Sequence, residues 1–136
     1  MTDTLKLRIV TPESTFYEEN VDMVTLQGVE GQMGVFPGHI RMMTQMVPGE
    51  MIVRRNGRDE FLAVGAGLVE ISSHAVDIVT DMAITAENID EAKAEEARQR
   101  AAARLRERIS SEEVATVNAS LVRSLAQLKV KRGHRA

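Results

Sequence analysis

The stretch ENIDEAKAEEAR, residues 87–98, divides the chain into two parts of different character. Before it, short runs of β-prone residues alternate with glycine-rich turns. After it, the chain to residue 136 contains one glycine and no proline, a composition typical of helix. The sequence therefore predicts a β module at residues 1–87 and a separate helical arm at 88–136. An arm of this kind typically contacts a partner or moves.

The first part carries several strand signals. Leu5, Leu7 and Ile9 alternate with charged residues, which predicts a half-buried strand, and residues 21–26 form a further β-prone run. Asn56-Gly57 separates two β-prone runs and is a strong hairpin signal, because type I′ turns need positive φ at both central residues. A second hairpin is predicted for residues 67–71 and 75–79, around Ser72-Ser73-His74.

The second part carries signals for two helices. Asn88 with Glu91 fits a helix N-cap, and Ser110 with Glu113 fits a second capping box after a short break. Apolar residues then follow helical spacing, every four residues at Ala97, Ala101, Leu105 and Ile109, and every seven at Val114, Leu121 and Leu128. Because each apolar stripe is thin, we expect a marginally stable hairpin that docks on the β module, docks on a partner, or switches between states.

These signals predict an α+β fold, with an N-terminal antiparallel β-sandwich followed by a C-terminal antiparallel αα-hairpin. Aromatic residues make up only 3% of the chain, so the core must be aliphatic. No βαβ pattern is present. No apolar stretch approaches the roughly 20 residues needed to span a bilayer, and the first ten residues do not fit a signal peptide.

The charge distribution and the motifs limit the classes of function that fit this chain. Residues 1–88 carry 6 basic and 13 acidic residues, and residues 89–136 carry 11 basic and 7 acidic ones. A basic arm suggests an acidic partner surface or nucleic acid, and an ordinary solvated helix explains it equally well. The acidic sandwich and only four aromatic side chains argue against nucleic acid. The chain lacks cysteine, metal-ligand spacing and nucleophile motifs, so we predict no metal and no catalytic residues.

The segment GVEGQMGVFPGH, residues 28–39, has glycine at every third position before Pro-Gly. Its spacing matches neither GxGxxG nor the P-loop, and Glu30 would repel phosphate, so we reject a phosphate site. Two interpretations remain: a tight structural loop, and an exposed loop shaped for a protein partner.

Several motifs together resemble the epsilon subunit of the bacterial F-type ATP synthase, from about residue 4 to residue 130. They are VxP at 10–12, VTLxGxxGxxGVxPGH at 24–39, PGxMI at 48–52, EFxAV at 60–64, VxIVxDxA at 76–83, IDEAKA at 89–94 and AQL at 126–128. The two-part organisation predicted from the residues agrees with the fold of this family, a β-sandwich followed by an αα-hairpin.

The resemblance implies a non-catalytic subunit of the central stalk. The sandwich would bind the gamma subunit and the ring of c subunits, and couple the catalytic head to that ring during ion-driven ATP synthesis. The hairpin would fold against the sandwich or extend to the alpha and beta subunits, where it inhibits ATP hydrolysis. The protein would be peripheral, at the cytoplasmic face of the bacterial inner membrane, with no direct membrane insertion and no nucleic-acid partner.

The resemblance also implies roles for individual residues. The loop with Glu30, Gly31, Gln32 and His39 would face the c ring, although many relatives have Glu at the position of Gln32, and Arg41 departs from the family pattern. The contact of the hairpin with the catalytic head would involve Arg104, Arg108, Arg123 and Lys129.

Some relatives bind ATP on the folded hairpin through an Ile/Leu-Asp-x-x-Arg-Ala motif and further arginines. The matching positions here are Ile89, Asp90, Lys93, Ala94, Arg100 and Arg123. Lys93 replaces the motif arginine and lacks its planar bidentate geometry, and Gln127 stands where another arginine would be. We therefore expect weak or absent ATP binding, with ATP at most a regulatory ligand and no other cofactor.

Overall fold

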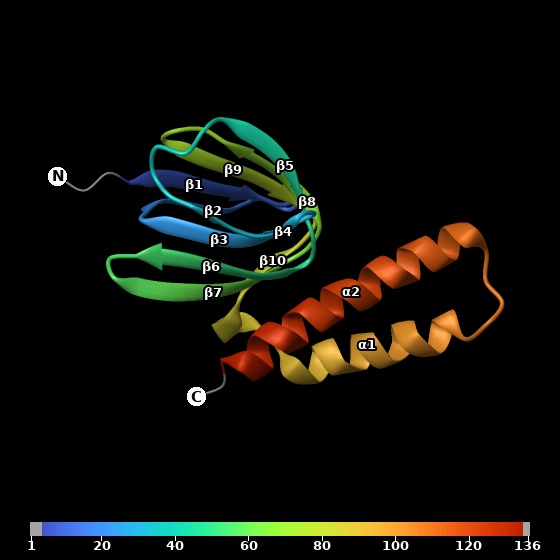
Figure 1. Cartoon of the computed structure of the whole chain (residues 1–136). Coiled ribbons are helices and arrows are strands. Elements are labelled where there is room, and N and C mark those ends of the chain that lie inside the picture. Colours follow the sequence, from blue (N-terminus) through green and yellow to red (C-terminus); the bar gives the residue numbers. More distant parts are fainter. Residues whose placement is uncertain (1–3, 135–136) are drawn as a thin grey trace.

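The computed structural model describes residues 4–134; the ends of the chain, residues 1–3 and the basic tail at 135–136, lie outside it. Ten strands between Leu5 and Thr85 form one body, and two helices form an arm beside it (Figure 1). The predicted fold, a β-sandwich followed by a helical hairpin, is confirmed.

The strands belong to one sheet that curls into a nearly closed sandwich. They are β1 (Leu5–Val10), β2 (Thr15–Val21), β3 (Met23–Gly28), β4 (Gly31–Val35), β5 (Met42–Met46), β6 (Gly49–Arg55), β7 (Arg58–Val64), β8 (Gly67–Ile71), β9 (Ala75–Thr80) and β10 (Ala83–Thr85). Their order is β10-β7-β6-β3-β5-β8-β9-β1-β2, and β4 pairs with β3. All recorded pairings are antiparallel except that of β1 with β9, which is parallel.

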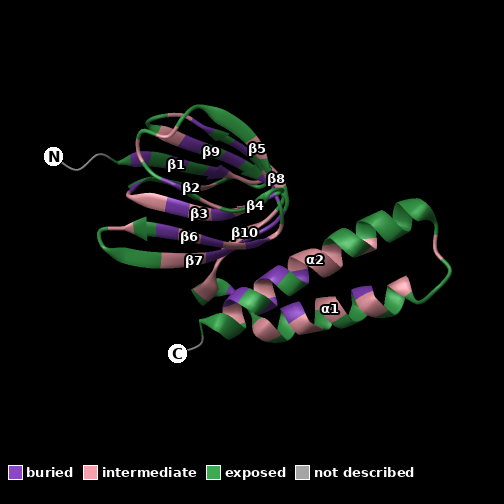
Figure 2. Ribbon diagram, in the orientation of Figure 1, coloured by how far each residue is buried: buried purple, intermediate pink, exposed green. Residues whose placement is uncertain are grey.

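The core lies between the two layers of the curled sheet and is aliphatic, as predicted. Leu5, Leu7 and Ile9 are fully buried, in line with their alternation along β1. The same alternation in the other strands fills the interior with Val, Leu, Ile and Met, whereas Phe16 and Tyr17 pack only at its margin. Purple residues alternate with green ones along the strands in Figure 2. Burial of this aliphatic face is what holds the sheet closed.

Polar contacts bridge the seam where β2 approaches β6 and β7. The Tyr17 hydroxyl donates a hydrogen bond of 3.0 Å to Glu60, and the Arg55 guanidinium lies 3.4 Å from the Glu19 carboxylate. Burial, reinforced by the bond to Glu60, raises the pKa of Tyr17 to about 12. The first strands are therefore linked to the middle of the chain by side chains where backbone pairing ends.

Both predicted hairpins are present. Asn56 and Gly57 join β6 to β7 with φ of 55° and 75°, the positive values that a type I′ turn requires. Residues 72–74 join β8 to β9, which pair throughout.

The β-prone run at residues 21–26 is confirmed as strand except at Asp22, where the chain turns from β2 into β3. The Asp22 amide donates to the Arg54 carbonyl at 2.8 Å, and its carboxylate accepts from the Asn56 amide at 3.1 Å. These bonds turn the chain from one sheet edge to the strand beside β6. Strands β2, β4, β5 and β10 carry no strong alternation, and the sequence did not predict them.

The arm consists of a 3-10 turn, η1 (Ala86–Asn88), and the helices α1 (Glu91–Leu105) and α2 (Ser111–Gly133). The expected N-cap at Asn88 is wrong: Asn88 ends η1, and Asp90 caps α1 by accepting from the Lys93 amide at 3.1 Å. Buried, extended Ile89 separates the two elements and carries the chain to the later cap. Ser110 caps α2 as predicted, and the Glu113 carboxylate pairs with Arg104 at 2.6 Å.

The hairpin is docked, the first of the three arrangements that the sequence left open. The C-terminal half of α2 packs on β6 and β7, and α1 packs on α2. A small apolar cluster of Ala63, Ile89 and Val130 forms the junction. The turn between the helices points away from the sandwich, and the adjoining turns of α2 are exposed (Figures 1 and 2). The arm is therefore held at one end only.

The core packing predicts that substitution of leucine by alanine lowers the free energy of unfolding by different amounts at two positions. Leu26 is fully buried on β3, whereas Leu68 on β8 is 52% exposed. We expect Leu26→Ala to lower the free energy of unfolding by about 2–5 kcal/mol, because it leaves a cavity. Leu68→Ala should change it by less than about 0.5 kcal/mol. Urea denaturation of both full-length variants measures this, and equal effects would contradict the assignment of the core.

Candidate functional site

The candidate sites of this protein are surfaces. Among residues 4–134, no group of three His, Cys, Asp or Glu side chains could hold a metal ion. No helix in the same described range is long and apolar enough to cross a membrane. The residues that the sequence predicts to bind partners lie on the segment from β3 to β5 and on the hairpin.

The glycine-rich segment folds as a strand between two turns, so it is more than a loop. Residues Val29 and Glu30 form the turn from β3 to β4, where Gly31 has a φ of 123°, and Gln32 follows in β4. His39 lies beyond the other end of β4, after the turn at Gly38, with its Nδ1 2.6 Å from the Ile40 carbonyl. Because β4 spans roughly 16 Å, the structure groups Glu30, Gly31 and Gln32 and places His39 apart from them.

Large apolar side chains are exposed beside the His39 turn. Ile40 is 84% exposed, Phe36 57% and Met43 66%. The Gly38 amide donates to the Ser73 carbonyl at 2.8 Å, which fixes this turn to the β8–β9 hairpin. A group of exposed apolar residues on a fixed turn is typical of a protein-binding surface.

The outer face of the sheet carries a second apolar patch. Leu68 on β8 and Val79 on β9 lie directly opposite one another, and both are more than half exposed. Met43 on β5 pairs with Glu70, the next outward residue of β8. Met43 is thus diagonal to Leu68, and exposed apolar side chains occur from β9 to β5 beside the polar Glu70 and Gln45. Exposed apolar side chains on neighbouring strands are typical of a protein-binding surface.

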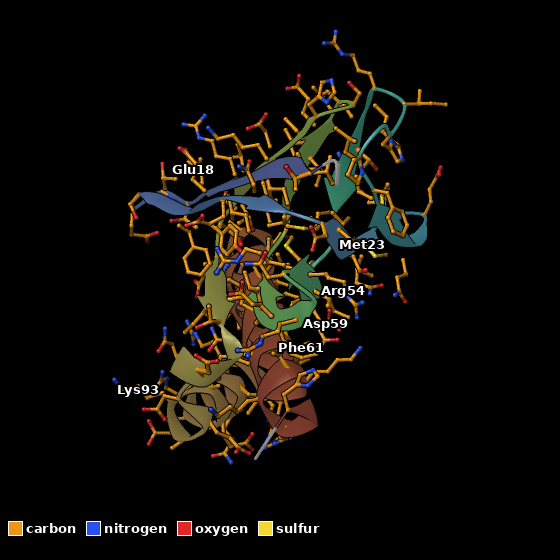
Figure 3. All side chains as sticks on the ribbon, turned by 90° about the vertical axis from the view of Figure 1, so that its left-hand side faces the viewer. Glu18, Met23, Arg54, Asp59, Phe61 and Lys93 are labelled. Carbon is orange, nitrogen blue, oxygen red and sulfur yellow. The ribbon has the colours of Figure 1, made fainter. Side chains whose placement is uncertain are left out.

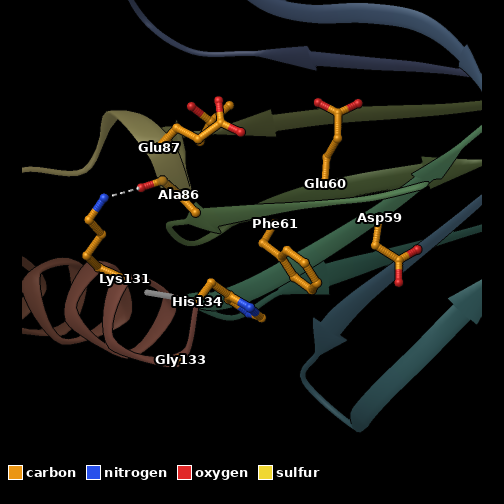
Figure 4. Close-up of a pocket in the computed structure, with 9 residues that line it drawn as sticks. Asp59, Glu60, Phe61, Ala86, Glu87, Lys131, Gly133 and His134 are labelled. Carbon is orange, nitrogen blue, oxygen red and sulfur yellow. Dashed lines mark hydrogen bonds between the residues drawn. The ribbon is translucent and has the colours of Figure 1, made fainter. Parts of the chain in front are cut away.

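Polar side chains surround the junction of hairpin and sandwich. Arg123 lies 3.4 Å from Asp81, the Gln127 amide lies 3.0 Å from the Met82 sulfur, and the Lys131 ammonium donates to the Ala86 carbonyl at 3.1 Å. The ring of His134 stacks on Phe61 with centroids 3.6 Å apart (Figure 4). Its Nε2 lies 2.6 Å from the Glu50 carboxylate. The sandwich thus binds α2 through both side chains and backbone.

Comparisons with known proteins assign both parts of the chain to domains of one family. The family model described as "ATP synthase, Delta/Epsilon chain, beta-sandwich domain" matches residues 4–86, and the model described as "ATP synthase, Delta/Epsilon chain, long alpha-helix domain" matches residues 87–132. The chain belongs to the ATP synthase delta/epsilon-chain family. The resemblance seen in the sequence is thereby confirmed.

Relatives named ATP synthase epsilon chain match nearly end to end. The protein of Herpetosiphon aurantiacus is 37% identical over 126 residues, 93% of either chain, and that of Psychrobacter arcticus is 35% identical over 133 residues, 97% of this chain and 96% of its own. The protein of Bacillus subtilis is 39% identical over 102 residues, 75% of this chain and 77% of its own. This epsilon chain is accordingly a subunit of the ATP synthase other than the catalytic one.

Solved structures share the fold. A chain of the mitochondrial ATP synthase of Euglena gracilis aligns with a TM-score of 0.73 at 24% identity, covering 96% of this chain and 82% of its own. A chain from the central stalk and c ring of the Tetrahymena thermophila enzyme aligns with a TM-score of 0.64 at 13% identity, covering 93% and 96%.

The residues matching the nucleotide motif of the epsilon family lie on both helices of the hairpin. Ile89, Asp90, Lys93 and Ala94 form the first turn of α1 and the residues before it, where Ile89 and Ala94 are buried and Asp90 caps the helix. Lys93 projects away from the sandwich (Figure 3). Arg100 lies about 10 Å beyond Lys93 along α1, in a groove with Arg104, and Arg123 pairs with Asp81. Weak or absent ATP binding stays a prediction.

The basic residues predicted to contact the catalytic head lie at two places on the hairpin. Arg104 and Arg108 are at the free end, where Arg104 pairs with Glu107 and Glu113. Arg123 and exposed Lys129 lie nearer the sandwich, with Lys129 about 27 Å from the start of α2. Of these four residues, only Arg123 is engaged by the sandwich in the docked hairpin, through Asp81.

The sequence did not predict two groups of candidate functional surface residues. The exposed Phe36, Ile40 and Met43 follow no period that distinguishes surface from core. The acceptors of the α2 side chains, Asp81 and Met82, lie between β9 and β10, 42 and 45 positions away in the sequence. One signal was present: Arg123, Gln127 and Lys131 recur every four residues and share a helix face.

Glu95 on α1 offers a pH test of the hairpin. Hydrogen bonds from Arg98, aided by a bond from Gln99 and the charge of Arg132, hold the pKa of Glu95 at about 2, against an ordinary value of 4.5. Because the folded-state pKa is low, its stabilisation is present above pH 4.5 and is lost as the pH falls toward 2. We expect a carboxyl NMR titration midpoint far below 4.5, which Arg98→Ala raises and Arg106→Ala leaves unchanged. An ordinary midpoint would contradict the ion pair.

Proposed function

We propose that this epsilon chain is a rotor subunit of the central stalk, which couples the catalytic head to the membrane c ring during ion-driven ATP synthesis and inhibits ATP hydrolysis through its hairpin. The observation that carries the proposal is the asymmetry of the molecule. The sandwich keeps extended apolar surfaces exposed, while the arm is attached at one end by a small apolar junction. A stable anchor with a weakly held arm suits these two roles.

In this proposal the sandwich binds the gamma subunit and the c ring. The patch of Met43, Leu68 and Val79 offers gamma an apolar face on a rigid sheet. The c ring meets the edge of β4, which pairs with β3 and with no second strand among residues 4–134. A partner lying along this edge reaches Glu30, Gly31 and Gln32 at one end and His39 at the other, which accounts for the separation of these residues.

The arm would act on the alpha and beta subunits. The arm has a net positive charge, whereas the sandwich has a net negative one. Acidic loops on the catalytic head would therefore attract the arm. Arg104 and Arg108 lie at its free end and would make the first contact, whereas Arg123 is released from Asp81 only on undocking. Lys129 is exposed already in the docked hairpin. A small junction needs only a few kcal/mol of differential binding to change its population.

The location follows from these partners. We place the epsilon chain at the cytoplasmic face of the bacterial inner membrane, as a peripheral subunit held by gamma and the c ring without inserting into the bilayer. Inhibition needs no nucleotide on the epsilon chain in this proposal, in keeping with the engagement of Arg123 by Asp81 and with Lys93 in place of the motif arginine.

Removal of the arm tests the inhibitory role. A chain ending at Glu87 keeps the sandwich core and loses α1 and α2. Added to an epsilon-depleted catalytic complex, the full chain should lower the rate of ATP hydrolysis, and the short chain should bind without lowering it. If both chains bind and neither inhibits, the inhibitory role is refuted while the rotor role stands. If neither binds, the rotor role fails as well.

A charge at the His39 turn tests the role of the sandwich as an anchor. Ile40→Asp puts a carboxylate in the exposed apolar patch and should weaken binding to a gamma–c-ring subcomplex by about tenfold or more, since burying an unpaired charge at an interface costs over 1 kcal/mol. Val114→Asp at the far end of the hairpin is the matched control and should bind normally. Equal affinities in a titration would contradict the assigned surface.

A further inference from the structure

We propose that four side chains near the C-terminus of α2, Arg123, Gln127, Lys131 and His134, form a clamp that holds the hairpin in its docked state. The inference deepens the proposed function, on which its regulatory meaning rests, because release of the clamp would free the arm. The clamp itself is a property of the isolated chain and can be tested without the ATP synthase complex.

The first three clamp residues form a polar stripe on α2, and all three contact one short segment of the chain. Their spacing of four places Arg123, Gln127 and Lys131 on one face of α2. They contact Asp81, Met82 and the Ala86 carbonyl in the same order along the chain. Six consecutive residues, 81–86, thus bind three turns of helix. This matched order fixes the register of α2 along the segment that leads into α1.

The fourth residue closes the clamp on the other side of the helix end. His134 stacks on Phe61 of β7 with an interplanar angle of 19° and reaches Glu50 of β6. Figure 4 shows the two rings facing each other while Lys131 points to Ala86 on the opposite side. The last turn of α2 is therefore bound by the linker and by two strands.

The position of Asp81 depends on a glycine. A Cβ atom on Gly65 would lie 1.8 Å from the Asp81 carboxylate, so only glycine leaves room for this rotamer. The Asp81 amide also donates to the Ala66 carbonyl at 3.3 Å. The β7–β8 connection thus presents the carboxylate to Arg123, and Gly65 acts as a positioning residue of the clamp.

The contacts that join the two helices form a separate set. Arg132 lies 2.9 Å from Glu91 and 3.3 Å from Glu95, and these pairs join the end of α2 to the start of α1. Arg104 and Glu113 join the helices at the free end, 2.6 Å apart. None of these pairs involves the sandwich. Opening of the clamp therefore releases α2 from the sandwich while the pairs between the helices persist.

The clamp is suited to release because each of its contacts is weak. Arg123 and Asp81 are partly exposed, and an exposed pair changes a population by up to about fivefold. The His134–Phe61 stack contributes about two- to tenfold. An acidic partner surface that takes Arg123 and Lys131 competes directly with Asp81 and Ala86. The docked state is thus held by groups that a partner can replace.

Distance measurements on the full chain test the clamp. The sequence has no cysteine, so Glu70→Cys on β8 and Asn118→Cys on α2 give two unique sites for spin labels. We expect one dominant distance in the parent chain. Asp81→Asn or Arg123→Gln should raise the population at longer distances by about two- to fivefold. The double variant should match either single one, because the two residues act as a pair.

Two further variants and a control complete the experiment. His134→Ala should raise the long-distance population by about two- to tenfold, and Gly65→Ala should mimic Asp81→Asn by displacing the carboxylate. Glu113→Gln removes an ion pair of the same kind at the free end and should leave the distances unchanged. If the clamp variants also leave the distances unchanged, the proposal is overturned.

The readout separates the clamp from the proposed function. If Asp81→Asn, Gly65→Ala and His134→Ala undock the hairpin and also inhibit hydrolysis at lower concentration than the parent chain, both proposals are supported. Arg123→Gln is left out of this assay, because Arg123 is itself assigned to the contact with the catalytic head. If they undock it and hydrolysis does not respond, the clamp stands and the inhibitory role fails.

Discussion

The contact of α2 with β6 and β7 is the constraint on which the behaviour of the arm depends. At its centre are Ala63, Ile89 and Val130, all almost completely buried, and small or β-branched side chains let the helix approach the strands closely. The cluster is far smaller than the core of the sandwich. Because apolar burial scales with area, the sandwich is a stable body and the junction is a weak one. The position of the arm is therefore set by a narrow energy difference, to which single polar contacts contribute measurably.

The two parts of the epsilon chain differ in how their surfaces are used. The sandwich buries an aliphatic interior and leaves Ile40, Leu68 and Val79 on its outside, where no interior packing needs them. The arm buries mainly alanine along α1 and holds Arg98, Arg104, Arg123 and Arg132 in ion pairs. Rigid apolar faces favour lasting contacts, and exposed ion pairs exchange partners readily. This contrast fits a subunit that stays anchored by one part while the other changes its contacts.

Local sequence patterns predicted much of this structure. They failed where tertiary contacts determine the start of a helix or the formation of a strand. The Asn56-Gly57 hairpin and the Ser110 cap depend on neighbouring residues alone, and both were predicted correctly. The cap at Asn88 was wrong because burial of Ile89 shifts the helix start to Asp90, a preference that no local pattern encodes. The glycine-rich segment was read as one loop, although β4 separates its two turns. Pairing with β3 makes β4 a strand, and such pairing is not visible in five residues with two glycines.

The sequence by itself determined the aliphatic core, the change from strands to helices near residue 87, the charge of the arm and, through its motifs, the family. These features follow from composition and short-range periodicity. Only the tertiary structure decided that the arm is docked, that Arg123 meets Asp81, that His134 meets Phe61, and that Ile40 and Leu68 face outward. The physical reason is distance along the chain. Contacts between residues 42 and 73 positions apart, as in these two pairs, depend on how the whole sheet closes. That closure is the sum of many weak interactions, which no single stretch of sequence encodes.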